Sequence, residues 1–127
     1  MQTVLIVDTR SHRKFLRTIL ISAGYQVEFA CASSDLVATV GSSNPSVVLL
    51  TWTQSSTCAQ TACMTLRRNS AKLPIIVLGP KVRSVAKIRL LEMGADDFVE
   101  EPFDDDELIA RIRSLIRNAE LNTNLGR

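Results

Sequence analysis

Short apolar runs separated by longer segments of mixed polarity make up this chain. Residues 47–50 read Val-Val-Leu-Leu and residues 75–78 read Ile-Ile-Val-Leu. Near-continuous apolar runs of this length are typical of parallel strands that are buried on both faces. Residues 25–30 alternate between apolar and polar side chains, as in a half-exposed strand. We therefore expect strands at residues 4–7, 25–30, 47–50, 74–78 and 97–99.

Between these runs, apolar residues recur every three or four positions, which is the spacing of an amphipathic helix. Gly24 and Gly94 are expected to end the first and fourth helices, because glycine tolerates the left-handed conformation common at helix ends. Ser34 is expected to cap the second helix, which a turn at residues 41–45 follows. The expected helices lie at residues 10–23, 35–40, 57–68, around 85–91, and from 104 to about 118.

Strands and helices alternate along the whole sequence. Right-handed crossovers between parallel strands place helices on both faces of a sheet. The expected fold class is therefore α/β, a doubly wound five-stranded parallel sheet with five helices. In such folds, ligands and chemistry lie at the carboxyl ends of the strands. The apolar period fades after Asn118, so we expect one domain at residues 1–119 and the start of a linker at residues 120–127.

Composition narrows the class of protein. The chain has 127 residues, 46% hydrophobic and 22% charged, which fits one globular domain with a single core. Its apolar runs are too short to span a bilayer and it does not open on a signal segment, so we expect a cytoplasmic protein. The net charge of +2 includes no sustained basic stripe for nucleic acid. Cys31, Cys58 and Cys63 form no Cys-x-x-Cys pair and are expected to be buried, reduced thiols.

The third expected strand ends at an informative residue. Residues 45–51 read Pro-Ser-Val-Val-Leu-Leu-Thr, which places Thr51 where doubly wound folds carry their chemistry. This segment resembles the Pro-Asp-x-Val-Leu-Leu-Asp pattern of the receiver domains of two-component response regulators, in which the last Asp accepts a phosphoryl group. The resemblance extends over residues 5–8, 24–27, 74–78, 94–98 and 102–113.

The last third of the chain resembles the OmpR-like subclass of response regulators, in which a winged-helix DNA-binding domain usually follows the receiver. The resemblance implies a flavodoxin-like, CheY-like receiver fold over residues 1–119. It also implies that residues 120–127 begin a linker to a C-terminal DNA-binding domain that is not in this chain.

The sequence departs from the family at the positions of its phosphoryl chemistry. Receivers use two adjacent acids, an acceptor Asp, a Ser or Thr after the fourth strand and a Lys before the last Pro. Threonine cannot form an acyl phosphate, and one Asp beside two threonines is a poor site for Mg²⁺. We therefore expect no cofactor, no metal and no enzymatic activity. The residues of this degenerate phosphorylation pocket are Asp8, Thr9, Thr51, Gly79 and Glu101.

Several residues have more than one interpretation. Thr51 is either a strand end that hydrogen-bonds locally or a threonine that an outside kinase phosphorylates. Asp8 either caps the following helix and bonds nearby threonines or keeps a metal role. Trp52 is either a packing lid over the emptied pocket or an exposed anchor for a partner. His12 is expected to be a surface residue.

The resemblance also implies two conformational features. In receivers, an aromatic side chain rotates when the Ser or Thr after the fourth strand reports phosphorylation, and the matching residues here are Phe98 and Gly79. Because glycine has no hydroxyl group to pull on the ring, we expect Phe98 to keep one rotamer. The bond between Glu101 and Pro102 matches a Lys-Pro bond that is cis in many receivers, so a cis bond is expected.

The face made by the expected fourth helix, fifth strand and fifth helix retains the family pattern. In the OmpR-like class this face forms a two-fold dimer with salt bridges, and here Ile88 and Leu91 would supply its apolar centre. The alternative is a solvated charged face, since exposed ion pairs contribute only about 0–1 kcal/mol. The expected dimer face consists of Lys87, Ile88, Leu91, Asp97, Glu107 and Arg111.

These features favour an atypical receiver, a regulatory and dimerisation module for transcription that works without aspartyl phosphorylation. Its expected partners are a second copy, a sensor kinase or another regulator protein, and DNA only through a domain outside this chain. No membrane partner is expected. The rival hypothesis is a stand-alone adaptor that binds a partner protein through the same face or through Trp52. A flavodoxin-like domain for a nucleotide or small ligand is disfavoured, because no Gly-rich loop follows Val7.

Overall fold

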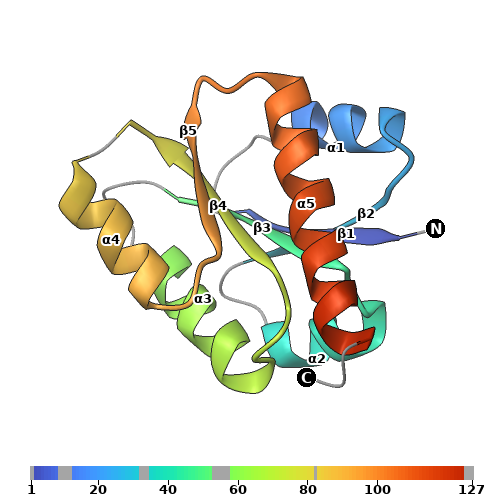
Figure 1. Ribbon diagram of the computed structural model, residues 1–127, viewed down its shortest axis with the longest axis horizontal. Helices are drawn as coiled ribbons and strands as arrows, with labels where there is room; N and C mark the ends of the chain where they lie inside the picture. Colours follow the sequence, from blue (N-terminus) through green and yellow to red (C-terminus); the bar gives the residue numbers. More distant parts are fainter. Residues whose placement is uncertain (1, 9–12, 32–34, 53–57, 82, 125–127) are drawn as a thin grey trace.

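The computed structural model describes residues 2–8, 13–31, 35–52, 58–81 and 83–124. Within these residues, strands and helices alternate as the sequence predicts (Figure 1). The strands are β1 (Thr3–Asp8), β2 (Gln26–Cys31), β3 (Val47–Thr51), β4 (Ile75–Pro80) and β5 (Asp97–Glu101). The helices are α1 (Arg13–Ser22), α2 (Leu36–Ser43), α3 (Cys58–Asn69), α4 (Ser84–Glu92) and α5 (Asp105–Asn124).

The five strands form one parallel sheet in the order β2-β1-β3-β4-β5. Helices α1 and α5 cover one face of the sheet, and α2, α3 and α4 cover the other (Figure 1). The predicted fold class, a doubly wound five-stranded parallel sheet, is confirmed. The strand order reverses at β1, so the carboxyl ends of β1 and β3 flank the place where such sheets bind ligands.

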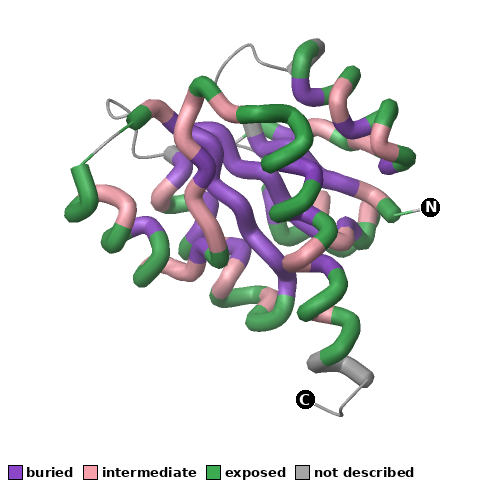
Figure 2. The backbone as a smooth tube through the Cα atoms, turned by 45° about the horizontal axis from the view of Figure 1, so that its top comes forward, coloured by how far each residue is buried: buried purple, intermediate pink, exposed green. Residues whose placement is uncertain are grey.

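Strand β3 lies at the centre of the sheet and is buried along its whole length (Figure 2). Val47 and Leu49 pack under α1 and α5, whereas Val48 and Leu50 pack under the other three helices. Successive side chains of a strand point to opposite faces, which explains why both sets must be apolar. The same alternation decides on which face the residues at the end of the strand lie.

Helices α1, α3 and α5 bury apolar residues at the helical spacing that the sequence shows. Leu16 and Leu20 of α1 are buried against the sheet beside Leu108 and Ile112 of α5. On the opposite face, Leu66 of α3 is buried, as expected. None of the described helices is long and apolar enough to cross a membrane.

Helix α2 differs from its prediction at both ends. Asp35, rather than Ser34, is the N-cap, and its carboxylate accepts a hydrogen bond from the backbone N–H of Ala38. Ser34 lies outside the described residues. The helix continues to Ser43 and ends at Asn44, whose backbone is left-handed with φ 47° and donates to the carbonyl of Val40. Asparagine tolerates this conformation, so the polar residues expected to form a turn extend the helix by almost one turn instead.

Three other elements extend at least two residues beyond their predicted carboxyl ends. Strands β4 and β5 continue two residues further, to Pro80 and Glu101, and these two residues pair in register. Gly79 and Glu101 are therefore held by the sheet rather than by loops. Helix α5 runs to Asn124, five residues past the domain end expected at residue 119. The linker and the domain that would follow it remain predictions.

Candidate functional site

The carboxyl ends of β3, β4 and β5 bring Thr51, Pro80 and Glu101 to one edge of the sheet. Thr51 is 4% exposed, and its hydroxyl group donates to the backbone carbonyl of Val7 at 3.5 Å. A contact of that length is at the limit of hydrogen bonding. This geometry agrees with the interpretation of Thr51 as a strand end that bonds locally.

Part of the degenerate phosphorylation pocket lies outside the described structure. Thr9 is not among the described residues, and neither is His12. Asp8 is the last residue of β1, where its backbone pairs with Cys31, but its side chain is not described. Among the described side chains, no three potential metal ligands lie together. The expectations for Asp8, Thr9 and His12 remain predictions.

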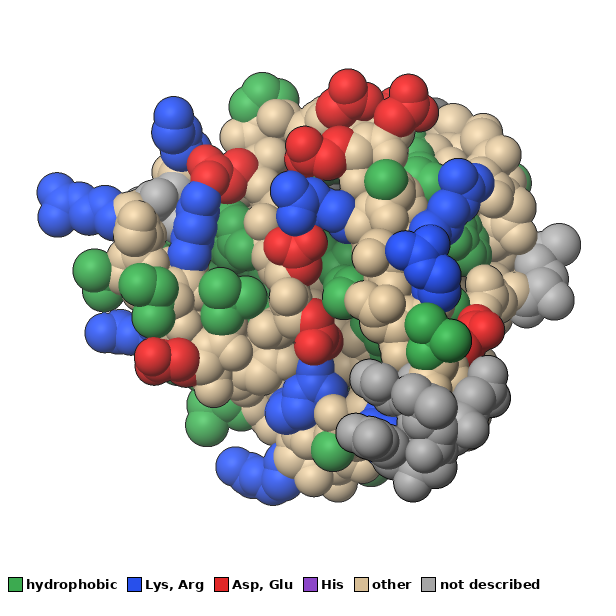
Figure 3. All heavy atoms as spheres, in the orientation of Figure 1, with side chains coloured by type: hydrophobic (Ala, Val, Ile, Leu, Met, Phe, Trp, Pro, Cys, Tyr) green, Lys and Arg blue, Asp and Glu red, His purple; other side chains and the backbone are tan. Residues whose placement is uncertain are grey.

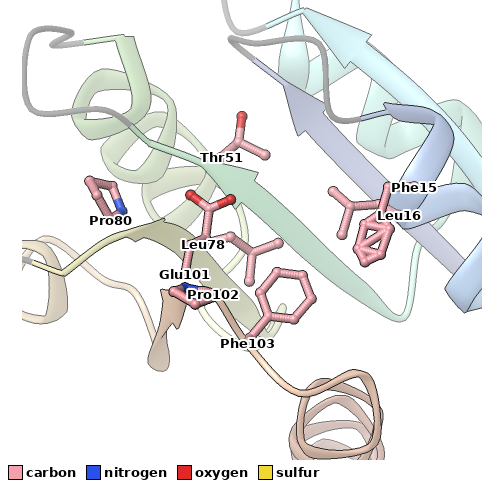
Figure 4. A pocket seen from close by; sticks show the side chains of 8 residues that line it. All are labelled: Phe15, Leu16, Thr51, Leu78, Pro80, Glu101, Pro102 and Phe103. Atoms are coloured by element: carbon pink, nitrogen blue, oxygen red, sulfur yellow. The ribbon is translucent and has the colours of Figure 1, made fainter.

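Thr51 and Glu101 border a common cavity of about 460 Å³ (Figure 4). The carboxylate of Glu101 extends into this cavity from the end of β5, and the peptide bond that follows it, to Pro102, is cis as expected. The cavity separates α1 from the ends of β3, β4 and β5. The residues that line it are Phe15, Leu16, Thr51, Leu78, Pro80, Glu101, Pro102 and Phe103.

Gly79 does not line this cavity, because it faces the other side of the sheet. A Cβ atom on Gly79 would lie 2.9 Å from Cε3 of Trp52 and 3.2 Å from Cζ of Phe98. The two rings meet edge to face, with centroids 6.0 Å apart. Side chains therefore fill the space in which a larger residue at position 79 would stand.

Trp52 is 4% exposed and belongs to the core under α2, α3 and α4. The interpretation of Trp52 as an exposed anchor is wrong, because the indole cannot reach a partner from there. The alternative was a lid over the emptied pocket. Trp52 packs over Gly79 but does not line the cavity beside Thr51, so it covers only the Gly79 part of that pocket. Its indole N–H has no hydrogen-bond partner among the described residues.

The expected dimer face presents apolar side chains from α4. Ile88 is 52% exposed and Leu91 is 42% exposed, and Val85, which was not predicted in this role, is 67% exposed. Figure 3 shows apolar side chains over α4, with acidic and basic side chains interleaved over β5 and α5. Val85 lies one turn before Ile88 on the same helix face, and this spacing is the sequence signal that could have identified it.

The charged residues of this face pair within the chain. Arg111 donates to Asp97 at 2.7 Å and lies 3.7 Å from Glu107 on its own helix. The hydrogen bond to Asp97 raises the pKa of the Arg111 guanidinium above its ordinary value. Lys87 pairs with Glu100, a residue that the sequence reasoning missed. Glu100 shares a face of β5 with Phe98, and Lys87 lies 5.7 Å from the centroid of the Phe98 ring.

The cysteines differ from one another. Cys63 is buried in α3, and burial raises the pKa of its thiol. Cys31 is exposed, which corrects the prediction that the thiols are all buried. It ends β2, an edge strand of the sheet, where alternate side chains face solvent. The side chain of Cys58 lies outside the described part.

Comparison with curated proteins finds transcriptional regulators. The chain is 37% identical over 127 residues to the probable transcriptional regulator ycf27 of Porphyra purpurea, covering 98% of this chain and 52% of the relative. It is 33% identical over 119 residues to the phosphate regulon transcriptional regulatory protein PhoB of Pseudomonas aeruginosa, covering 91% of this chain and 52% of the relative. The chain thus spans about half the length of these curated relatives.

Solved structures share the fold. A CheY-like response regulator receiver domain protein from Methanospirillum hungatei superposes with a TM-score of 0.84 at 18% identity, covering 96% of this chain and 98% of that one. A putative response regulator from Chloroflexus aurantiacus gives a TM-score of 0.81 at 27% identity, covering 91% and 98%. The response regulator receiver domain family matches residues 4–113. This chain therefore belongs to the response regulator receiver domain family.

Proposed function

We propose that this chain is an atypical receiver, a regulatory and dimerisation module of a transcriptional response regulator that works without aspartyl phosphorylation. The observation that carries the proposal is Thr51 at the carboxyl end of β3, where the family's acceptor Asp is expected. An acyl phosphate needs a carboxylate, and Thr51 offers a hydroxyl group. The names of the curated relatives support a role in transcription. This chain spans about half the length of those relatives, and we propose that DNA is bound by a domain outside it.

The electrostatics of the cavity support the same proposal. Phosphoryl transfer requires cations that neutralise the charge on the phosphoryl oxygens. Glu101 instead brings a carboxylate to the cavity that Thr51 borders. Of the described side chains around the cavity, only those of Thr51 and Glu101 carry oxygen, whereas Mg²⁺ prefers several oxygen ligands in octahedral geometry. This part of the site does not fit the metal that the family uses.

Packing beside Gly79 supports a receiver that does not switch through its aromatic residue. Trp52 and Phe98 occupy the space around Gly79, and Phe98 also contacts the ammonium group of Lys87. A Phe98 ring held on two sides, with no hydroxyl group at position 79, lacks the means to respond to a phosphoryl group. A receiver of this kind would regulate through its state of assembly or through another ligand.

The exposed side chains of Val85, Ile88 and Leu91 support dimerisation through α4, β5 and α5. A two-fold interface uses the same patch on both copies, and this patch combines an apolar row with charges of both signs. The second candidate, an adaptor that binds another protein, would use the same exposed row. Burial of Trp52 removes the other surface on which that candidate relied.

Intact-mass measurement after incubation with acetyl phosphate and Mg²⁺ tests the central claim. We expect the mass to stay unchanged in the wild-type chain. The matched control combines Thr9→Asp, Thr51→Asp and Glu101→Lys. Phosphorylation of part of this variant is compatible with the proposal. A gain of one phosphoryl group on the wild-type chain would refute the proposal.

Sedimentation velocity at tens of micromolar tests the dimer. We expect a dimer for the wild-type chain and a monomer for Ile88→Glu, because a carboxylate at the centre of the apolar row would be desolvated on both copies. Val37→Glu is the matched control, since Val37 is also an exposed apolar residue but lies on α2. A wild-type chain that remains monomeric would favour the adaptor.

A further inference from the structure

One arginine connects the end of helix α3 to the turn between α4 and β5. Arg67 lies in the last turn of α3, and its side chain is 23% exposed. Its Nε and Nη2 atoms both donate to the backbone carbonyl of Gly94, at 3.0 and 2.7 Å. The turn that contains Gly94 lies beside α3 (Figure 1). A guanidinium group presents its donors in a rigid fork, so the two bonds fix the direction of this carbonyl as well as its position.

The same guanidinium group also binds two neighbouring segments. Its Nη1 atom donates to the carbonyls of Ser70 and Ala71, just after α3, at 3.2 and 2.9 Å. Its Nη2 atom forms an ion pair with Asp96 at 2.8 Å, and this carboxylate accepts a hydrogen bond from the backbone N–H of Ile75. Charge-assisted hydrogen bonds are about twice as strong as neutral ones. Arg67 therefore joins the end of α3, the start of β4 and the turn before β5 through one planar group.

The apolar stem of Arg67 lies against the backbone of Gly94. A Cβ atom on Gly94 would lie 2.8 Å from both Cβ and Cγ of Arg67. Gly94 has φ 122°, a conformation that glycine adopts without strain. The turn therefore depends on glycine for its conformation and for the close approach of the arginine.

This turn separates two members of the expected dimer face. Leu91 lies three residues before Gly94, whose backbone N–H donates to the Leu91 carbonyl at 3.1 Å. Asp97 directly follows Asp96 and holds Arg111. A displacement of the turn would therefore move an apolar residue and a charged residue of the face relative to each other.

We propose that Arg67 is a positioning residue for self-association. It holds the turn between α4 and β5, so that Leu91 and Asp97 are presented together, although α3 is not an element of the expected dimer face. The inference deepens the proposed function and rests on it, because it requires the dimer through α4, β5 and α5. A substitution on α3 would then change the affinity of the dimer without removing a side chain of the face.

Arg67→Lys tests the inference, because lysine keeps the positive charge and an apolar stem but lacks the fork of donors. Arg68→Lys, at the exposed neighbouring position, is the matched control. Sedimentation equilibrium measures the dissociation constant of the dimer, and circular dichroism checks that both variants are folded. We expect Arg67→Lys to raise the dissociation constant about three- to tenfold, and Arg68→Lys to leave it unchanged.

Hydrogen exchange reports on the turn itself, at a protein concentration below the dissociation constant of the dimer. The backbone N–H groups of residues 93–96 all donate to backbone carbonyls, so they should exchange slowly in the wild-type chain. Arg67→Lys should speed their exchange about tenfold, because the turn would open locally more often. The N–H groups of Tyr25 and Gln26, at the opposite edge of the sheet, should change less.

Four outcomes would overturn the inference. The first is an unchanged dissociation constant for Arg67→Lys, and the second is an equal weakening by Arg68→Lys. The third is a weaker dimer with unchanged exchange at residues 93–96, since the arginine would then act by another route. The fourth, a wild-type chain that stays monomeric, would also refute the proposed dimer. Failure of Arg67→Lys alone, with a wild-type dimer, would leave the proposed function standing.

Discussion

The two faces of the sheet differ at its carboxyl edge. On the face of α1 and α5, Thr51 and Glu101 border a cavity, whereas on the opposite face Trp52 and Phe98 fill the space beside Gly79. Thr51 and Trp52 are neighbours in the chain, so the alternation of an extended backbone sends them to opposite faces. Residues that depart from the family's chemistry thus border open space on one face and packed side chains on the other. Substitutions on the packed face should therefore lower the free energy of unfolding more than substitutions on the open face.

The largest expected effect is on the packed face. Trp52→Ala should lower the free energy of unfolding by about 3–5 kcal/mol, because it empties a buried site next to Phe98. Phe15→Ala, at the entrance of the cavity, is the matched control and should cost only about 1 kcal/mol, since half of that ring is already in water. Urea denaturation followed by circular dichroism measures both. Equal losses would break the contrast between the two faces.

A smaller loss is expected for Gly79→Ala, about 1–3 kcal/mol, because the added methyl group would lie 2.9 Å from the Trp52 ring. In a Trp52→Phe background the ring atom at that distance is gone, so the loss from Gly79→Ala should shrink. Part of it should remain, because the backbone oxygen of Trp52 also lies 3.2 Å from the new atom. A double-mutant cycle by urea denaturation checks this coupling. Additive losses would show that Trp52 does not limit the space.

Alkaline pH should weaken the packed face through Cys63. Burial raises the pKa of this thiol, so the folded state holds the proton more tightly than the unfolded state does. The stabilisation is fully present below the unfolded pKa, about 8.5, and is lost as the pH rises through the folded pKa. Unfolding free energies measured from pH 7 to 10 should therefore fall more steeply for the wild-type chain than for Cys63→Ala. Parallel slopes would contradict this assignment.

The smallest effect is expected on the open face. Thr51→Val keeps the shape of the side chain and removes its hydroxyl group. A neutral hydrogen bond contributes about 0.5–1.5 kcal/mol to stability, so the loss should be about 1 kcal/mol. Thr51→Ala is the control that also removes a methyl group and should be more destabilising. The same urea titrations measure both variants. A loss above 2 kcal/mol for Thr51→Val would show that the hydroxyl group is a structural anchor.

The sequence predicts the fold because hydrophobic spacing decides it. The strand at β3 follows directly from a near-continuous apolar run, and the buried faces of α1, α3 and α5 follow from apolar residues at a period of 3.6. The ends of elements are less predictable, since they depend on single hydrogen bonds. Asp35 took the capping role expected of Ser34, and α2 continued through residues that resemble a turn until Asn44 ended it.

The candidate site is predictable only in part. Family positions identified Thr51, Gly79 and Glu101, but not that Gly79 lies on the opposite face from the other two. That division follows from strand alternation once β4 is known to reach Pro80. The burial of Trp52 and the apolar cavity depend on side chains from distant segments, which no local pattern brings together. The pairing of Lys87 with Glu100 has the same origin.

The ion pairs inside one copy affect how the exposed face would assemble. Arg111 already holds Asp97, and Lys87 already holds Glu100. Salt bridges between two copies would therefore replace existing pairs, so their net electrostatic gain would be small. Burial of Val85, Ile88 and Leu91 would then supply most of the driving force, which carries a negative heat-capacity change. Such an assembly would respond to temperature and protein concentration more than to ionic strength.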